Sequence, residues 1–211
     1  MGLDKNVDPD SIHFYSDQKK LQGWLFKSKD QKATSLIILL QGAVGEDGDL
    51  LNLGKSLSGS GIHVLTYNYP GSWRSEGMRL DVTALKSVED ALDYSMSKTF
   101  KEYFEIEFDE IILCGYSYGG GLALVAGAQY EALDKIIALA PIDFKTLATD
   151  LEKSTEFRKF HQDFVDKILS NPKVARGTTG EDYHNSLLKN KELFNMKTFA
   201  PKLAKKKLLF I

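Results

Sequence analysis

Three short, mainly apolar segments constrain the fold of this chain more than any other feature. They span residues 35–40, 63–69 and 111–115, and segments with helical spacing separate them. Strands that are apolar on both faces are typical of a parallel sheet that is covered on both sides. Residues 135–140 give a further strand-like segment. The chain is therefore expected to alternate strands and helices around a mostly parallel, doubly wound sheet.

The intervening segments show the periodicity of amphipathic helices. Leucines recur at helical intervals between the first two strands, and Gly61 follows where a helix would end. Between the next two strands, apolar residues step by three or four positions among charged ones, from Val82 to Met96. At the start of the chain, residues 11–16 and 21–27 predict a two-stranded antiparallel hairpin.

The length and composition favour one domain over residues 1–211. With 211 residues and 43% hydrophobic content, the chain can bury one substantial core. We assign the core to residues 11–143 and 200–211. Residues 144–199 are charged and amphipathic, and they are predicted to form an inserted helical cap whose apolar face carries Phe157, Phe160, Phe164 and Ile168. This face could line an acyl pocket or dock the cap on the core.

Charge and cysteine content exclude several classes of function. The formal net charge of −2 and the absence of a basic stripe argue against nucleic acid as a partner. The single cysteine, Cys114, lies among apolar neighbours and is expected to be a buried thiol. His13 and His63 fall in predicted strands away from any ligand cluster, so no metal site is expected. No secretory leader or membrane span is apparent, and a cytoplasmic location is the default expectation.

The strongest local motif is Gly115-Tyr116-Ser117-Tyr118-Gly119, which fits G-x-S-x-G. It lies between a predicted strand and the glycine- and alanine-rich segment 119–130, which is the context that a nucleophile elbow requires. Glycines are needed there because the chain turns sharply and leaves the serine hydroxyl exposed on strained backbone. We infer that Ser117 is a nucleophile and that the helix after it favours negative charge on the reacting group.

On these residues the chain resembles the α/β-hydrolase family, from about residue 11 to residue 211. The resemblance implies an α/β-hydrolase fold and an oxyanion hole made by the backbone N–H groups of Ala43 and Tyr118. Ala43 belongs to the segment 41–45, in which Gln41 stands where the family usually has histidine. The loop 69–77 is similar to the glycine-rich loop that follows the next strand in the family. No cofactor is implied.

A serine hydroxyl needs a histidine base and a carboxylate to become a good nucleophile. In the family, the acid usually follows the strand that begins here near Lys207, and the histidine follows one more strand. Both positions would lie beyond Ile211, so we expect the chain to be truncated, its last strands missing, and the triad histidine to lie beyond Ile211. Alternatively, Asp143 could be the acid and His161 or His184 the base. However, the ordinary expectation for His161 and His184, which lie in the predicted cap, is a solvated surface position. The ordinary expectation for Asp143 is that it caps the helix that begins near Phe144.

The sequence thus predicts a serine hydrolase that attacks an ester, thioester or related small-molecule acyl substrate and forms an acyl-enzyme on Ser117. The alternative is a non-catalytic binding module, or an inactive fragment, that keeps the elbow without a base. A histidine that reaches Ser117 would discriminate between them.

Overall fold

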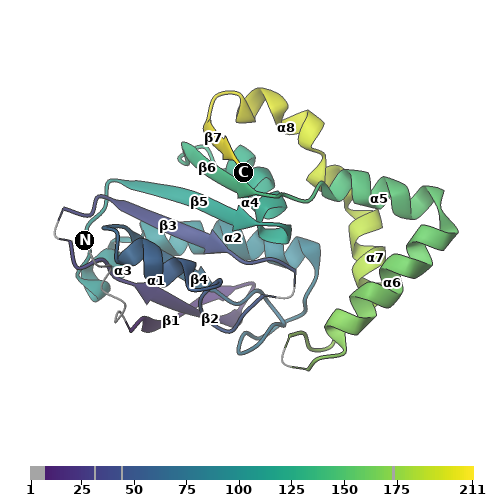
Figure 1. Cartoon of the computed structure of the whole chain (residues 1–211), viewed down its shortest axis with the longest axis horizontal. Helices are drawn as coiled ribbons and strands as arrows, with labels where there is room; N and C mark the ends of the chain where they lie inside the picture. Colours follow the sequence, from purple (N-terminus) through teal and green to yellow (C-terminus); the bar gives the residue numbers. More distant parts are fainter. Residues whose placement is uncertain (1–7, 31, 44, 173) are drawn as a thin grey trace.

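The computed structural model describes residues 8–30, 32–43, 45–172 and 174–211. Within them, seven strands form one sheet in the order β1-β2-β4-β3-β5-β6-β7 (Figure 1). The strands are β1 (Asp10–Ser16), β2 (Lys19–Phe26), β3 (Ser35–Leu40), β4 (His63–Tyr67), β5 (Glu110–Tyr116), β6 (Lys135–Leu139) and β7 (Lys207–Phe210).

The pairing of the strands confirms the predicted topology. β1 and β2 form the antiparallel hairpin, and β2 joins β4 in antiparallel register. From β4 onward every pairing is parallel, and β3 lies between β4 and β5. The carboxyl ends of the parallel strands therefore share one edge of the sheet, where ligand sites of open α/β sheets are usually found.

Helices cover both faces of this sheet and extend beyond one edge (Figure 1). They are α1 (Leu53–Ser58), α2 (Asp81–Met96), α3 (Lys98–Phe104), α4 (Tyr118–Gln129), α5 (Phe144–Lys153), α6 (Thr155–Leu169), α7 (Gly180–Lys189) and α8 (Met196–Leu203), with a short 3₁₀ helix at Lys191–Phe194. The crossover helices were predicted, and α2 ends at Met96 as expected, but the short helix α3 was not predicted.

Alternating residues of each central strand enter two different cores. In β3, Leu36 and Ile38 belong to the larger core, which includes residues of α2 and α4, whereas Ile37 and Leu39 belong to the smaller core near α1. All four are at most 3% exposed. A strand buried on both faces reads as a continuous apolar run, which explains why the sheet was visible in the sequence.

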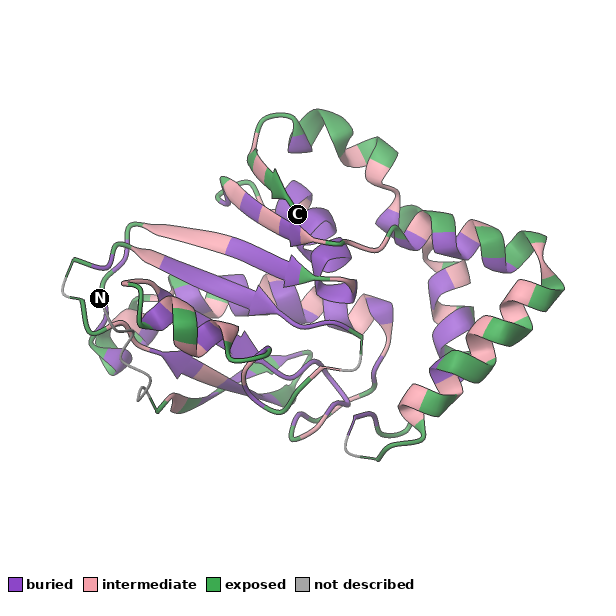
Figure 2. Ribbon diagram, viewed as in Figure 1, coloured by how far each residue is buried: buried purple, intermediate pink, exposed green. Residues whose placement is uncertain are grey.

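The helices α5, α6 and α7 lie beyond the carboxyl ends of β3 and β5, and the outer side of α6 is largely exposed (Figures 1 and 2). The predicted apolar face of this region is only partly correct. Phe157 packs against the main core, but Phe160 is 68% and Phe164 52% exposed. Val165 is the one residue of α6 that is buried. The aromatic stripe therefore does not dock the whole helix on the core.

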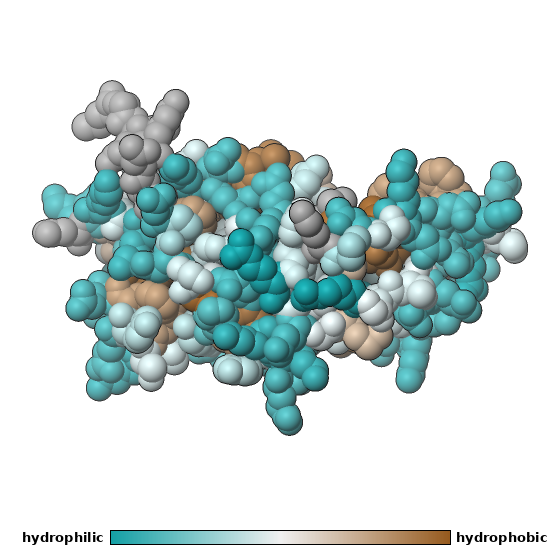
Figure 3. All heavy atoms as spheres, turned by 90° about the horizontal axis from the view of Figure 1, so that it is seen from below, coloured by the Kyte–Doolittle hydropathy of each residue, from teal (hydrophilic) through white to brown (hydrophobic). Residues whose placement is uncertain are grey.

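On the face shown in Figure 3, hydrophilic side chains cover most of the surface, and apolar side chains form small separate patches. None of the helices in the described part of the chain is long and apolar enough to cross a membrane.

Candidate active site

Ser117 lies at the junction of β5 and α4 with an unusual backbone conformation. Its φ of 52° and ψ of −110° fall outside the regions that L-residues favour. Two backbone hydrogen bonds hold it there: its N–H donates to Leu139 O at 2.8 Å, and its carbonyl accepts from Ile142 N at 3.1 Å. The tight strand-to-helix turn is therefore locked onto the end of β6 and the segment after it.

The glycines on either side of Ser117 have no room for a side chain. A Cβ on Gly115 would overlap the backbone of Gly119, and a Cβ on Gly119 would lie 2.5 Å from the carbonyl oxygens of Leu40 and Gln41. Because these neighbours are backbone atoms, no rotamer change could relieve the contact. The close approach of α4 to the end of β3 thus depends on glycine.

Tyr118, one of the two expected oxyanion donors, is the first residue of α4. The first N–H groups of a helix have no acceptor within the helix, and they carry partial positive charge. The Tyr118 ring is buried and packs edge-to-face against Tyr69 and Phe144. This packing fixes the start of α4 beside Ser117.

Ala43, the other expected donor, lies three residues after the end of β3. The buried side chain of Gln41, two residues before it, makes two hydrogen bonds: its amide oxygen accepts from Glu46 N, and its Nε2 donates to Gly48 O at 3.4 Å. The Tyr69 hydroxyl donates to Gln41 O at 2.9 Å. Gln41 therefore makes local hydrogen bonds in the position where the family usually has histidine.

The loop 69–77 folds back on itself and leads into α2. Gly71 has a φ of 73° and donates its N–H to Glu76 O at 2.9 Å, and the Ser75 hydroxyl donates to Asn68 O at 2.7 Å. Immediately after this loop come Arg79 and Asp81, both buried, whose importance the sequence did not reveal.

Asp81 appeared in the sequence as one of the charged residues between the apolar positions of a helix, but it is completely buried. Burial raises the pKa of its carboxyl group to about 7, an effect that the Tyr183 and Tyr118 hydroxyls and the charge of Arg79 partly offset. Asp81 thus belongs to a buried polar cluster that lies under Tyr118 and reaches α7 through Tyr183.

Asp143 lies close to Ser117, because Ile142 hydrogen-bonds to the serine carbonyl. Its carboxylate caps α5: Oδ1 accepts from Thr146 N at 3.0 Å, and Oδ2 accepts from the Thr146 hydroxyl at 2.9 Å. The helix-capping alternative is therefore observed directly. No described histidine is hydrogen-bonded to this carboxylate.

The expectation of two solvated histidines in residues 144–199 was wrong. His184 is completely buried, and its Nε2 lies 2.8 Å from Nδ1 of His161. Burial and the neighbouring His161 and Arg158 lower the pKa of His184 to about 4, so this ring is neutral at pH 7. Helices α6 and α7, which carry the two histidines, pack against each other, and His161 stays partly exposed. The histidines contact each other, and among the described residues none is paired with the Ser117 hydroxyl.

Comparison with known proteins identifies the family of this chain. The family model described as serine aminopeptidase, S33 (Hydrolase_4) matches residues 31–207. The chain belongs to this α/β-hydrolase family.

Two curated relatives match parts of the chain. A polyketide transferase from Penicillium sp. is 31% identical over 60% of this chain and 42% of its own length. A proline iminopeptidase from Saccharolobus solfataricus is 31% identical over 45% of this chain and 29% of its own length. The matched regions thus span less than half of either relative.

Among solved structures, the esterase Est1E from Butyrivibrio proteoclasticus with bound ferulic acid superimposes with a TM-score of 0.65. The match covers 95% of this chain and 88% of Est1E at 17% sequence identity. At that identity the likeness establishes the α/β-hydrolase fold alone.

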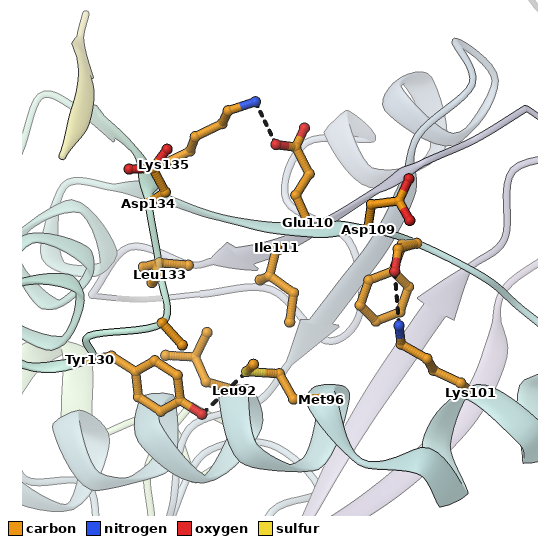
Figure 4. A pocket seen from close by; sticks show the side chains of 12 residues that line it. Leu92, Met96, Lys101, Asp109, Glu110, Ile111, Tyr130, Leu133, Asp134 and Lys135 are labelled. Atoms are coloured by element: carbon orange, nitrogen blue, oxygen red, sulfur yellow. Dashed lines mark hydrogen bonds and ion pairs between the residues drawn. The ribbon is translucent and has the colours of Figure 1, made fainter.

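A pocket of about 350 Å³ lies away from the expected hydrolase site (Figure 4). Its rim carries an ion pair between Glu110 and Lys135, the first residues of β5 and β6. It is therefore at the amino ends of strands whose carboxyl ends hold Ser117, opposite to the edge that serves as the ligand site in such sheets. The described residues contain no cluster of three or more His, Cys, Asp or Glu side chains suited to a metal ion.

Proposed function

We propose that this chain forms the core of a serine hydrolase, in which Ser117 attacks an ester, thioester or related acyl carbonyl and forms an acyl-enzyme. The observation that carries this proposal is the backbone of Ser117, with φ 52° and ψ −110° at the turn from β5 into α4. Such a conformation costs a non-glycine residue on the order of 1–3 kcal/mol. It has an evident use here, because it presents the hydroxyl at the carboxyl edge of the sheet.

The second support is an arrangement suited to an oxyanion. When Oγ of Ser117 bonds to the acyl carbon, the carbonyl π electrons move to the oxygen, which becomes negative. The Tyr118 N–H at the start of α4 and the Ala43 N–H would donate to that oxygen. When this intermediate collapses, the bond to the alcohol or thiol breaks, that leaving group takes up the proton from Ser117, and the acyl group stays on Oγ. Water then adds to the acyl carbon, Oγ leaves and regains a proton, and the acid is released. The chemistry needs no cofactor.

The proton on Oγ needs a base, and the triad histidine expected beyond Ile211 stays a prediction. The interpretation of α5–α7 as a cap that covers the acyl group is likewise proposed from its position beyond the strand ends. A cytoplasmic location also remains a proposal.

The rival proposal, a non-catalytic module, is favoured by one observation: the two histidines after Ser117 bind each other. Activity distinguishes the two proposals. We would measure hydrolysis of short-chain nitrophenyl esters and thioesters by the full-length protein, with S117A as the test variant and S60A, at an exposed serine, as its control. A loss of about 10³-fold or more in kcat for S117A alone supports the hydrolase. The hydrolase proposal would be overturned if S117A still hydrolysed these substrates, or if the full-length wild type hydrolysed none of them.

A further inference from the structure

Arg79 is a buried cation that sits directly behind the proposed oxyanion hole. It is 5% exposed, although Met78 immediately before it is 44% exposed. Burying a guanidinium is costly unless its donors are paired and its charge is balanced. Two of its donors are paired with residues that also shape the site around Ser117.

The guanidinium donates two hydrogen bonds. Nη1 donates to the Ser72 hydroxyl at 2.9 Å, and Nη2 donates to the carbonyl oxygen of Ala43 at 3.0 Å. The first bond ties Arg79 to the loop 69–77. The second bond ties it to the residue whose N–H is the proposed donor.

The peptide group between Gly42 and Ala43, which carries the Ala43 N–H, is flanked by two anchored carbonyls. On one side, Tyr69 donates its hydroxyl hydrogen to Gln41 O at 2.9 Å. On the other side, Arg79 holds Ala43 O. Because the planes of both neighbouring peptides are fixed, rotation of the peptide between them is opposed. The direction of the Ala43 N–H thus depends on Tyr69 and Arg79.

The same guanidinium also contacts the other half of the hole. Its Cζ lies 4.4 Å from the ring centroid of Tyr69 and 4.8 Å from that of Tyr118. Cation–π contacts of this kind are strongest when both partners are removed from water, as they are here. The carboxyl group of Asp81 is also buried, and the positive charge of Arg79 partly offsets the rise of its pKa on burial. One side chain therefore packs against the residues that carry or anchor both proposed donors.

We propose that Arg79 is a positioning residue that sets the two N–H groups of the oxyanion hole at the spacing that a tetrahedral oxyanion requires. This inference rests on the proposed function of Ser117. It explains why arginine occupies the position: a planar fork can donate to two acceptors while its faces lie on aromatic rings, whereas a lysine ammonium cannot do both.

The test compares R79K and Y69F with R74K in the full-length protein. R79K keeps the positive charge but loses the fork, and Y69F removes only the hydroxyl that holds Gln41 O. Arg74 is an exposed arginine in the preceding loop that pairs with Asp47, so R74K serves as the matched control. Thermal unfolding is measured for each variant alongside kcat and KM for one ester.

The expected result is a fall in kcat of about 10- to 100-fold for R79K and about 3- to 10-fold for Y69F, with KM changed less than about twofold. R74K should retain wild-type values. If R79K does not fold, Y69F decides. The inference on Arg79 would be overturned if kcat were unchanged in the folded variants, or if only KM rose. In that case an inactive S117A would still support the hydrolase. If S117A remains active, the proposed function fails first.

Discussion

A Cβ atom on Gly119 would lie 2.5 Å from the carbonyl oxygen of Leu40, the last residue of β3. The first turn of α4 therefore rests against the end of a neighbouring strand, without space for one methyl group. Because Ala43 follows Leu40 by three residues, this contact brings the start of α4 close to the segment that carries Ala43.

Replacement of Gly119 by alanine should destabilise the protein by about 3 kcal/mol, because backbone atoms would have to move apart. The control is G177A. Gly177 has a φ of 69°, but no atom lies within 4 Å of the position that a Cβ would take, so this variant should lose only about 1 kcal/mol. Urea unfolding measures both. Equal losses for the two variants would contradict the proposed steric cause.

Replacement of Ser117 by glycine should stabilise the fold while abolishing activity. Glycine adopts a positive φ freely, so S117G should be about 1 kcal/mol more stable than S117A, which keeps a Cβ and its strain. Denaturant unfolding of the two variants gives the difference. If S117G is the less stable one, the backbone of Ser117 is not strained.

Asp81 should make stability fall as the pH rises. Its pKa is raised to about 7 in the folded state, so the folded protein keeps a proton that the unfolded chain releases near pH 4. Between pH 5 and pH 8 the wild type should lose on the order of 3 kcal/mol from this group, as the buried carboxyl group ionises.

The variant D81N removes this titration and should show a correspondingly smaller loss between pH 5 and pH 8. D134N, at an exposed aspartate, should keep the wild-type slope. Unfolding free energies at both pH values provide the comparison. Parallel slopes for the wild type and D81N would rule out a raised pKa for Asp81.

His184 should make the stability of the protein fall as the pH falls, which is opposite to the effect of Asp81. Because its pKa is lowered to about 4, the unfolded chain binds a proton between pH 6.5 and pH 4 that the folded protein excludes. The wild type should therefore lose stability over this range as the pH falls, and H184Q should lose less. H13Q, at an exposed histidine, is the control. An acid transition of H184Q that coincides with that of the wild type would refute a neutral buried ring.

Asp143 should contribute to stability as a helix cap. D143A should lose about 1 kcal/mol, whereas D143N, which can still accept from Thr146 N, should stay near the wild type. The activity of the stable D143N variant then tests the triad role. A fall of about 10⁴-fold in kcat would assign the triad acid to Asp143, and an unchanged kcat would leave it as a cap alone.

Much of the fold could be predicted from local pattern. β3 is apolar on both faces because both faces are covered, and the elbow glycines are recognisable because their spacing follows from a steric need. The burial of Asp81 and His184 could not be predicted, since it depends on which helices pack together over them. Arg79 looks like an ordinary loop arginine until the fold brings Ala43 and Tyr118 to its side chain.

The most direct test of the central claim is intact-protein mass spectrometry of the full-length protein before and after treatment with a fluorophosphonate. Oγ of an activated serine displaces fluoride from phosphorus and remains covalently bound. We predict one adduct on the wild type and on S60A, and none on S117A. A wild type whose mass does not change, or an adduct that persists in S117A, would contradict the assignment of Ser117 as the activated nucleophile.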